Sequence, residues 1–319
     1  MNRKLAVSLL VGANIMWGSS YAVVKVALEE LPPPLLGALR ISLATLLIWL
    51  VLSWQARRSG AAGEAAGFEK VKRRDAIKLA GLGFCGVALD YLLGYWGVSL
   101  TTATDASLMI IGEVIFTTLL AVWLLGDRLS LRKTLGIVTG IAGVVTLVFG
   151  NIATGGPGAS GLGRAAGDLL ILAGLFAATL YSVLGAGLAR KYRPLTILAY
   201  AYAGSMILWA PLLIGYIAAG AFPAISATVI AGVIYLAVVT SLICHLVWFH
   251  VLRVTGANLG AISLFVQPLV GSLIGLLVLG DAFTPALALG AALIFTALYF
   301  TTVPDRKTTV EYALPEPSE

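Results

Sequence analysis

The chain contains ten apolar stretches, each close to the length needed to cross a lipid bilayer. A hydrocarbon core requires ~20 consecutive, mostly apolar residues in a helix. The stretches fall at residues 5–28, 34–54, 76–97, 101–125, 131–150, 166–189, 194–219, 227–252, 257–280 and 284–303. Transmembrane barrels show short alternating strands instead. The long continuous runs therefore predict an all-α membrane protein with ten transmembrane helices.

The composition supports this class. Hydrophobic residues make up 59% of the chain and charged residues only 11%, whereas soluble domains carry about 25% charged residues. A water-soluble fold could not bury this much apolar surface. The two cysteines, Cys85 and Cys244, lie inside apolar stretches. We interpret them as packing residues rather than a disulfide.

The lysines and arginines fall almost entirely in alternate loops. Of the 21 basic residues, only Arg164 lies in the other set of loops, and only Lys25 and Arg40 lie well inside spans. The positive-inside rule then places both termini in the cytoplasm, with the chain integral to the cell membrane (inner or plasma membrane). The same pattern explains the net charge of +6 as an orientation signal, so we expect no nucleic-acid partner.

The two halves of the chain resemble each other. The matching pairs are Tyr21 with Tyr181, Pro34 with Pro194, Glu113 with Gln267 and Gly136 with Gly290. Five spans is an odd number, so the second half enters the membrane upside down relative to the first. Inverted repeats of this kind are a recurring design of secondary transporters, with the substrate near the midplane.

This repeat predicts a division of the chain into three parts. We expect a first repeat at 1–150, a second at 164–303 and a cytoplasmic tail at 304–319, with a Gly/Pro/Ser-rich linker at 150–163. Small residues recur four apart, and such faces let helices approach closely in lipid. They are compatible with a monomer or a homodimer.

Several stretches resemble the drug/metabolite transporter superfamily, specifically EamA-type ten-helix transporters. They are 14–21 (NIMWGSSY), 121–129 (AVWLLGDRL), 275–281 (GLLVLGD), Gln267-Pro268, and the openings Leu135-Gly136 and Leu289-Gly290. The resemblance covers about 5–303. It implies two inverted five-helix repeats and export of a small metabolite by alternating access. The chain departs from the family pattern at Val114, where the family often has Pro, and at Asp127 and Asp281, where it often has Glu.

Five helices carry a stripe of polar and aromatic residues at helical spacing. We predict that these stripes line one cavity and bind a small-molecule substrate. The candidates on the stripes are Asn14, Trp17, Tyr21, Tyr91, Tyr95, Glu113, His245, Trp248 and Gln267. Tyr181, in the span 166–189, is added as an aromatic residue away from the span ends. In the alternative interpretation, each stripe packs against a neighbouring helix and its polar atoms bond to backbone.

Ionisable groups inside a membrane are expensive and are functional candidates by default. Glu113 lies near the midplane, which makes protons a candidate coupling ion; a neutral structural carboxyl is the competing interpretation. Lys25, Arg40, Asp90 and Asp105 lie in the outer third of their helices. We predict that they pair to form an outer gate, although Lys25 could instead snorkel outward.

Other motifs carry no chemistry in this context. Gly81, Gly83 and Gly86 spell G-x-G-x-x-G inside a span, without the preceding strand that a dinucleotide fingerprint needs. His245 and His250 do not have the spacing of a metal-binding H-E-x-x-H motif. We find no P-loop, no nucleophile–base pair and no metal cluster in the sequence. We therefore expect no enzyme activity, no cofactor and no metal.

Together these features predict a membrane transporter that exports a small polar or zwitterionic metabolite, with an amino acid as a reasonable class. A non-transporting membrane receptor or scaffold protein is the alternative, and a channel is a third.

Overall fold

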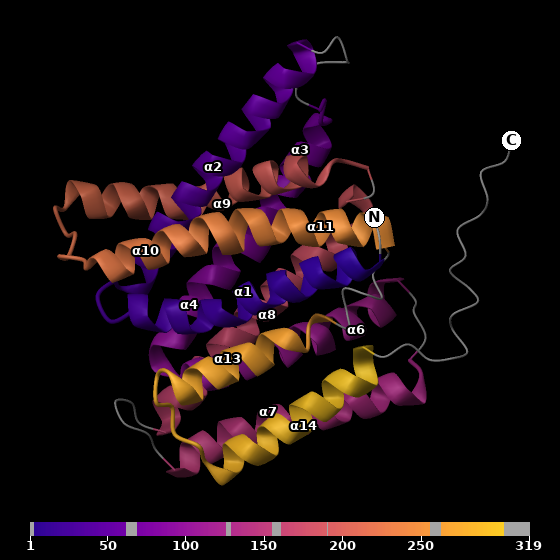
Figure 1. Cartoon of the computed structure of the whole chain (residues 1–319), viewed down its shortest axis with the longest axis vertical. Coiled ribbons are helices and arrows are strands. Elements are labelled where there is room, and N and C mark those ends of the chain that lie inside the picture. Colours follow the sequence, from indigo (N-terminus) through magenta and orange to yellow (C-terminus); the bar gives the residue numbers. More distant parts are fainter. Residues whose placement is uncertain are drawn as a thin grey trace, which may run out of the picture.

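The structure is a computed structural model that describes residues 3–61, 69–125, 129–154, 161–189, 191–255 and 263–302. Every regular element in these ranges is a helix (Figure 1). The first half contains α1 (Arg3–Ala27), α2 (Pro33–Ala61), α3 (Arg73–Gly83), η1 (Phe84–Leu89), α4 (Asp90–Leu100), α5 (Ala103–Leu108), α6 (Ile111–Leu125) and α7 (Leu131–Thr154). The second contains α8 (Gly161–Ala189), α9 (Pro194–Ala218), α10 (Ala227–Tyr235), η2 (Leu236–Ile243), α11 (Cys244–Thr255), α13 (Val266–Leu277) and α14 (Pro285–Thr302).

Eight of the described helical segments are long and apolar enough to cross a bilayer, and α13 and α14 are shorter apolar helices. In order along the chain they match the ten predicted spans, which confirms the predicted fold class. The predicted linker at 150–163 is shorter than expected, because α7 continues to Thr154 and α8 begins at Gly161. The tail at 304–319, the Gly126-Asp127 motif and residues 256–262 lie outside the described residues.

The helices pack in a pattern that repeats when the halves are exchanged. The fifth span of each half packs against the other, α7 with α14, and so do the second spans, α2 with α9 (Figure 1). The third span of the first half, α4, packs on α8, and the third span of the second half, α11, packs on α1. This exchange is the packing expected of two related five-helix repeats.

The irregularities of the helices also occur in pairs. The third span of each half contains a π-helical segment, η1 or η2. The fourth span of each half is interrupted, at Met109-Ile110 and at Leu264-Phe265. The first break forms without the family's proline. π-Segments inside helices occur frequently at functional sites, and here both lie beside the cavity described below.

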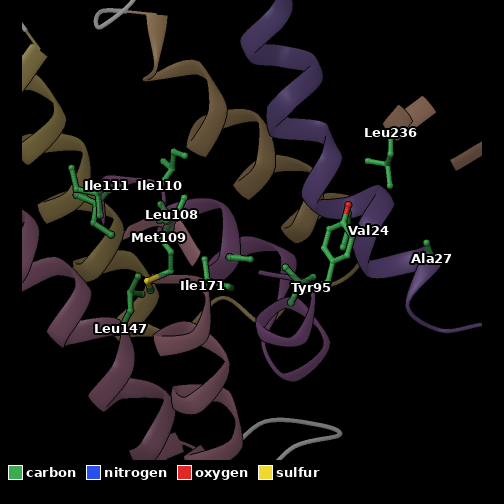
Figure 2. Packing of buried hydrophobic residues seen from close by; sticks show 14 of the residues in the cluster. Val24, Ala27, Tyr95, Leu108, Met109, Ile110, Ile111, Leu147, Ile171 and Leu236 are labelled. Carbon is green, nitrogen blue, oxygen red and sulfur yellow. The ribbon is translucent and has the colours of Figure 1, made fainter. Parts of the chain in front are cut away.

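Apolar side chains close the bundle around these breaks. Met109, Ile111 and Leu147 belong to one buried apolar cluster that also includes Tyr95 and Ile171 (Figure 2). Glycines let the helix backbones approach where contact is closest. A Cβ on Gly204 of α9 would stand 2.1 Å from the Ala80 carbonyl oxygen of α3, and a Cβ on Gly290 would stand 2.6 Å from Leu147.

Candidate functional site

A cavity of about 940 Å³ lies in the centre of the bundle and is lined by both halves of the chain. Its wall includes the exposed residues Lys191 and Arg193 at the start of α9. The cavity therefore reaches the surface at the end of the bundle where α1 and α9 begin, which we call the amino-terminal side (Figure 1). We call the other end the opposite side.

The structure brings nine of the ten predicted substrate-binding residues together on this cavity. They are Trp17, Tyr21, Tyr91, Tyr95, Glu113, Tyr181, His245, Trp248 and Gln267. Asn14 is not on the wall. It is fully buried, where its Nδ2 donates to the Leu10 carbonyl and to Ser263 Oγ, and its Oδ1 accepts from Gln267 Nε2 at 2.7 Å. Asn14 thus joins α1 to α13 from behind the cavity.

One wall of the cavity is acidic. Glu113 and Asp90 both line it, and neither carboxylate has a hydrogen-bond partner among the described residues. The break before α6 places Glu113 in the first turn of that helix, where the helix dipole favours negative charge. Asp90 lies within electrostatic range of both Glu113 and Arg40. These carboxylates are placed to receive a cation or a proton.

Arg40 forms the basic part of the same cavity. Only 3% of it is exposed. Its Nη1 donates to Tyr95 OH at 2.5 Å and its Nη2 to Tyr91 OH at 3.1 Å. The π-segment η2 supplies the other two acceptors: Ser241 Oγ accepts from Nε at 3.0 Å, and Thr240 Oγ1 accepts from Nη2 at 2.9 Å.

Aromatic rings form a third wall. Trp17 meets both His245 and Trp248 edge to face, with ring centroids 5.2 and 5.6 Å apart. The Thr240 carbonyl accepts from Trp17 Nε1 and from His245 Nδ1, each at 3.0 Å. These bonds fix the orientation of the Trp17 and His245 rings, so the aromatic wall is preformed. The wall is apolar apart from His245 Nε2.

On the opposite side the bundle is closed by a buried polar network. Arg164 Nη2 donates to Asp105 Oδ2 at 2.7 Å in an ion pair. Asn151 Nδ2 donates both to Asp105 at 3.1 Å and to Asp168 at 2.8 Å. Asp168 also accepts from Thr101 Oγ1 at 2.7 Å. We call Thr101, Asp105, Asn151, Arg164 and Asp168 the closing network.

The four predicted gate residues do not pair with one another. Lys25 Nζ donates to the carbonyl oxygens of Val98 and Thr101 at 2.9 and 2.5 Å, which ties α1 to the end of α4. Asp105 pairs with Arg164. Arg40 and Asp90 line the cavity. Among the described residues no ion pair joins a cation and an anion of this quartet.

At the open end, Lys191 contacts the Asp75 carboxylate, which also accepts from Tyr192 OH at 2.6 Å. The Asp75 hydrogen bond raises the pKa of Lys191. The backbone N–H of Arg193 donates to Glu69 Oε2 at 2.9 Å. The Lys191–Asp75 and Arg193–Glu69 contacts are solvent-exposed, so they contribute little to stability, but they connect the first half to the start of α9 at the mouth.

Sequence reasoning missed most of the closing network and several wall residues, including Tyr202, Ser182 and Phe249. Two signals were visible. Arg164 is the only basic residue in the loops that the positive-inside rule leaves uncharged, and a buried acid explains its position. Asp168 carried a signal as well, because it is an ionisable residue inside the predicted span 166–189, but the predicted candidates did not include it.

The fold and the cavity define a polytopic membrane protein with a central, one-sided cavity, which is the architecture of a carrier. The model of the EamA-like transporter family matches residues 4–149 and 165–303. Because these two matches cover most of the chain, this protein belongs to the EamA-like transporter family, a family of membrane transporters. The resemblance inferred from the motifs is thereby confirmed.

Several similar proteins carry transporter names. An uncharacterized transporter of Archaeoglobus fulgidus is 27% identical over 92% of this chain and 96% of its own length. A probable terminal-alkyne amino-acid exporter of Streptantibioticus cattleyicolor is 26% identical over 92% of each chain. A solved crystal structure superposes with a TM-score of 0.60 at 20% identity, covering 94% of this chain and 97% of that one. That likeness supports the fold alone.

Proposed function

We propose that this protein exports a small zwitterionic metabolite of the amino-acid class by alternating access. The observation that carries the proposal is the central cavity, which is open on the amino-terminal side and closed on the opposite side by buried polar groups. Since the basic loops lie at the open end, the positive-inside rule puts that end in the cytoplasm. The structure then corresponds to the state that loads substrate from inside.

The chemistry of the wall supports the substrate class. In the buried part of the cavity one guanidinium, two carboxylates and several aromatic rings face one space, while Glu69, Lys191 and Arg193 line the mouth. The whole cavity has a volume of about 940 Å³, near the upper end of the ~300–1,000 Å³ typical of ligand sites. A zwitterion with an apolar side chain complements such a wall. The name of the similar Streptantibioticus protein, a probable amino-acid exporter, agrees with this class.

The experiment is a flux assay with the purified chain in proteoliposomes. Labelled amino acids and related metabolites would be screened for saturable uptake and for counterflow from preloaded vesicles, which separates a carrier from a channel. Empty vesicles are the control. Saturable counterflow of one class supports the proposal. Binding of a ligand without flux would favour the receptor alternative and contradict transport.

Access is tested independently by cysteine labelling. Ser182 lines the cavity towards its open end, whereas Ser99 lies in α4 near the opposite side. In a background lacking Cys85 and Cys244, Ser182→Cys should react with an impermeant maleimide added from the cytoplasmic side, and Ser99→Cys should not. Labelling of Ser182→Cys only from outside would reverse the proposed orientation.

A further inference from the structure

Arg40 is a buried cation whose hydrogen-bond partners are all neutral. Its four bonds go to the hydroxyl groups of Tyr91, Tyr95, Thr240 and Ser241. Among the described residues no carboxylate forms an ion pair with it, although Asp90 and Glu113 face the same cavity. Burying an ion without a counter-charge costs several kcal/mol. The site as it stands therefore favours the arrival of an anion.

The guanidinium also keeps a donor for that anion. An arginine carries five N–H groups, and the four bonds use Nε once, Nη1 once and Nη2 twice. One N–H of Nη1 is left without a partner among the described residues. This N–H can donate one charge-assisted bond to a carboxylate oxygen, and such a bond is stronger than a bond to a neutral hydroxyl.

The surroundings hold the guanidinium in one orientation. Its Cζ lies 4.3 Å from the centroid of the Tyr91 ring, a cation–π contact. The π-segment η2 presents both Thr240 and Ser241 to it from the other half of the chain. A preorganised arginine loses little freedom when it binds, so this cluster has the properties of a recognition site rather than of a mobile gate.

We propose that Arg40 binds the carboxylate group of the transported substrate, while Asp90 and Glu113 face its positively charged group. This inference rests on the proposed function and adds to it the orientation in which the substrate binds. The sequence pattern placed Arg40 in an outer gate, and this inference places it in the substrate site instead. The proposed orientation also makes simple amines weaker ligands than the matching amino acids, because an amine can face Asp90 and Glu113 but leaves Arg40 without a counter-charge.

Binding would be measured with the full chain in detergent, by the shift of the thermal unfolding midpoint, so that the result does not depend on flux. The panel is the set of natural L-amino acids, each with its carboxamide and its decarboxylated amine. For wild type we expect at least one amino acid to stabilise the protein, with its amide and amine roughly tenfold weaker or worse, since a charge-assisted bond contributes ~1.5–3 kcal/mol.

In Arg40→Gln this preference for the acid over the amide should disappear. Arg40→Lys keeps the positive charge but not the planar guanidinium, so its preference for the acid over the amide should be intermediate. This variant also takes the place of Arg40→Gln if Arg40→Gln does not fold. Arg132→Gln is the matched control, because Arg132 lies against Tyr299 away from the cavity and should leave the preference intact.

Three results would overturn the inference. An undiminished acid-over-amide preference in Arg40→Gln removes Arg40 from recognition while leaving transport of amino acids in place. Binding of an amine to wild type as tight as that of its amino acid contradicts the proposed orientation of the substrate. If inorganic anions such as chloride stabilise wild type as well as every amino acid does, the site holds a structural anion only. Absence of flux with an intact Arg40-dependent preference instead contradicts the proposed function alone.

Discussion

Glu113 and Gln267 stand at equivalent points in the two halves, each just after the break in the fourth span, and both line the cavity. Their environments differ. Gln267 donates to Asn14 at 2.7 Å, whereas the Glu113 carboxylate has no hydrogen-bond partner among the described residues. The repeat thus provides one structural amide and one carboxyl group facing the cavity, at the same place in the fold.

We therefore expect Glu113→Gln to remove proton coupling without unfolding the protein. The variant substitutes the side chain that the other half already uses, so packing is preserved while titration is lost. Counterflow should persist at a higher half-saturating substrate concentration, because Glu113 also faces the positive group of the substrate, and acceleration by a pH gradient should disappear, as measured in proteoliposomes. Asp90→Asn is the comparison variant, since Asp90 is the second carboxylate of the acidic wall: it should also raise the half-saturating concentration but keep the pH response. Unaltered pH dependence in Glu113→Gln would show that Glu113 does not couple protons.

The amide pair itself predicts a stability effect. In Asn14→Leu, Gln267 Nε2 and Ser263 Oγ lose a bonding partner in a buried site. Leaving a buried polar group unpaired costs ~1–3 kcal/mol, so the thermal midpoint should fall. Thr179→Val is the control, because within the described part of the chain the buried Thr179 hydroxyl bonds only to the Leu175 carbonyl of its own helix. Equal midpoints for the two variants would contradict the role given to Asn14.

Helical spacing predicted the cavity well because it fixes which residues share a face. The stripe through Trp17 and Tyr21 does face the cavity, as do those through Glu113 and Gln267. Asn14, one turn before Trp17, does not lie on the wall, because the wall follows the stripe only while α1 borders the cavity. Closer to the amino-terminal side, the segment around α13 covers that face of α1, and the Asn14 side-chain amide donates to Ser263.

The predicted outer gate shows that the depth of a residue in the membrane does not by itself predict its contacts. Residues at similar depth on different helices meet only if their helices turn the right faces together, and a sequence does not give that rotation. Arg40 turns towards Tyr91 and Tyr95, while Asp105 turns towards α8 and meets Arg164. Identifying that pair required the packing of α5 on α8.

The buried pair between Asp105 and Arg164 gives a third prediction. Removing one partner of a buried ion pair leaves the other uncompensated and costs ~3–5 kcal/mol. Asp105→Asn should destabilise the closed opposite side, so that a cysteine in place of Val98, a buried residue of the cavity wall beside Thr101, becomes accessible to an impermeant maleimide from outside. Because Arg164 is the charge left behind, Arg164→Gln added to Asp105→Asn should restore protection. Failure of the second substitution to restore protection would contradict pairing as the source of closure.

The close contact between α3 and α9 gives the last prediction. A Cβ on Gly204 would stand 2.1 Å from the Ala80 carbonyl oxygen and 2.4 Å from its Cα, and backbone atoms cannot move aside as a side chain can. Overpacking costs ~1–3 kcal/mol, and more where the backbone must shift. Gly204→Ala should therefore lower the thermal midpoint and, by separating α3 from α9, reduce transport.

Gly215→Ala is the matched control in the same helix, because nothing lies within 4 Å of a Cβ at Gly215. Alanine is favoured over glycine by up to ~1 kcal/mol in a helix, so this variant should be neutral or slightly more stable. The contrast isolates contact from helix propensity. If both variants shift the midpoint upward, α9 does not approach α3 as closely as the structure has it, and the wall of the cavity formed by Tyr202 is placed differently.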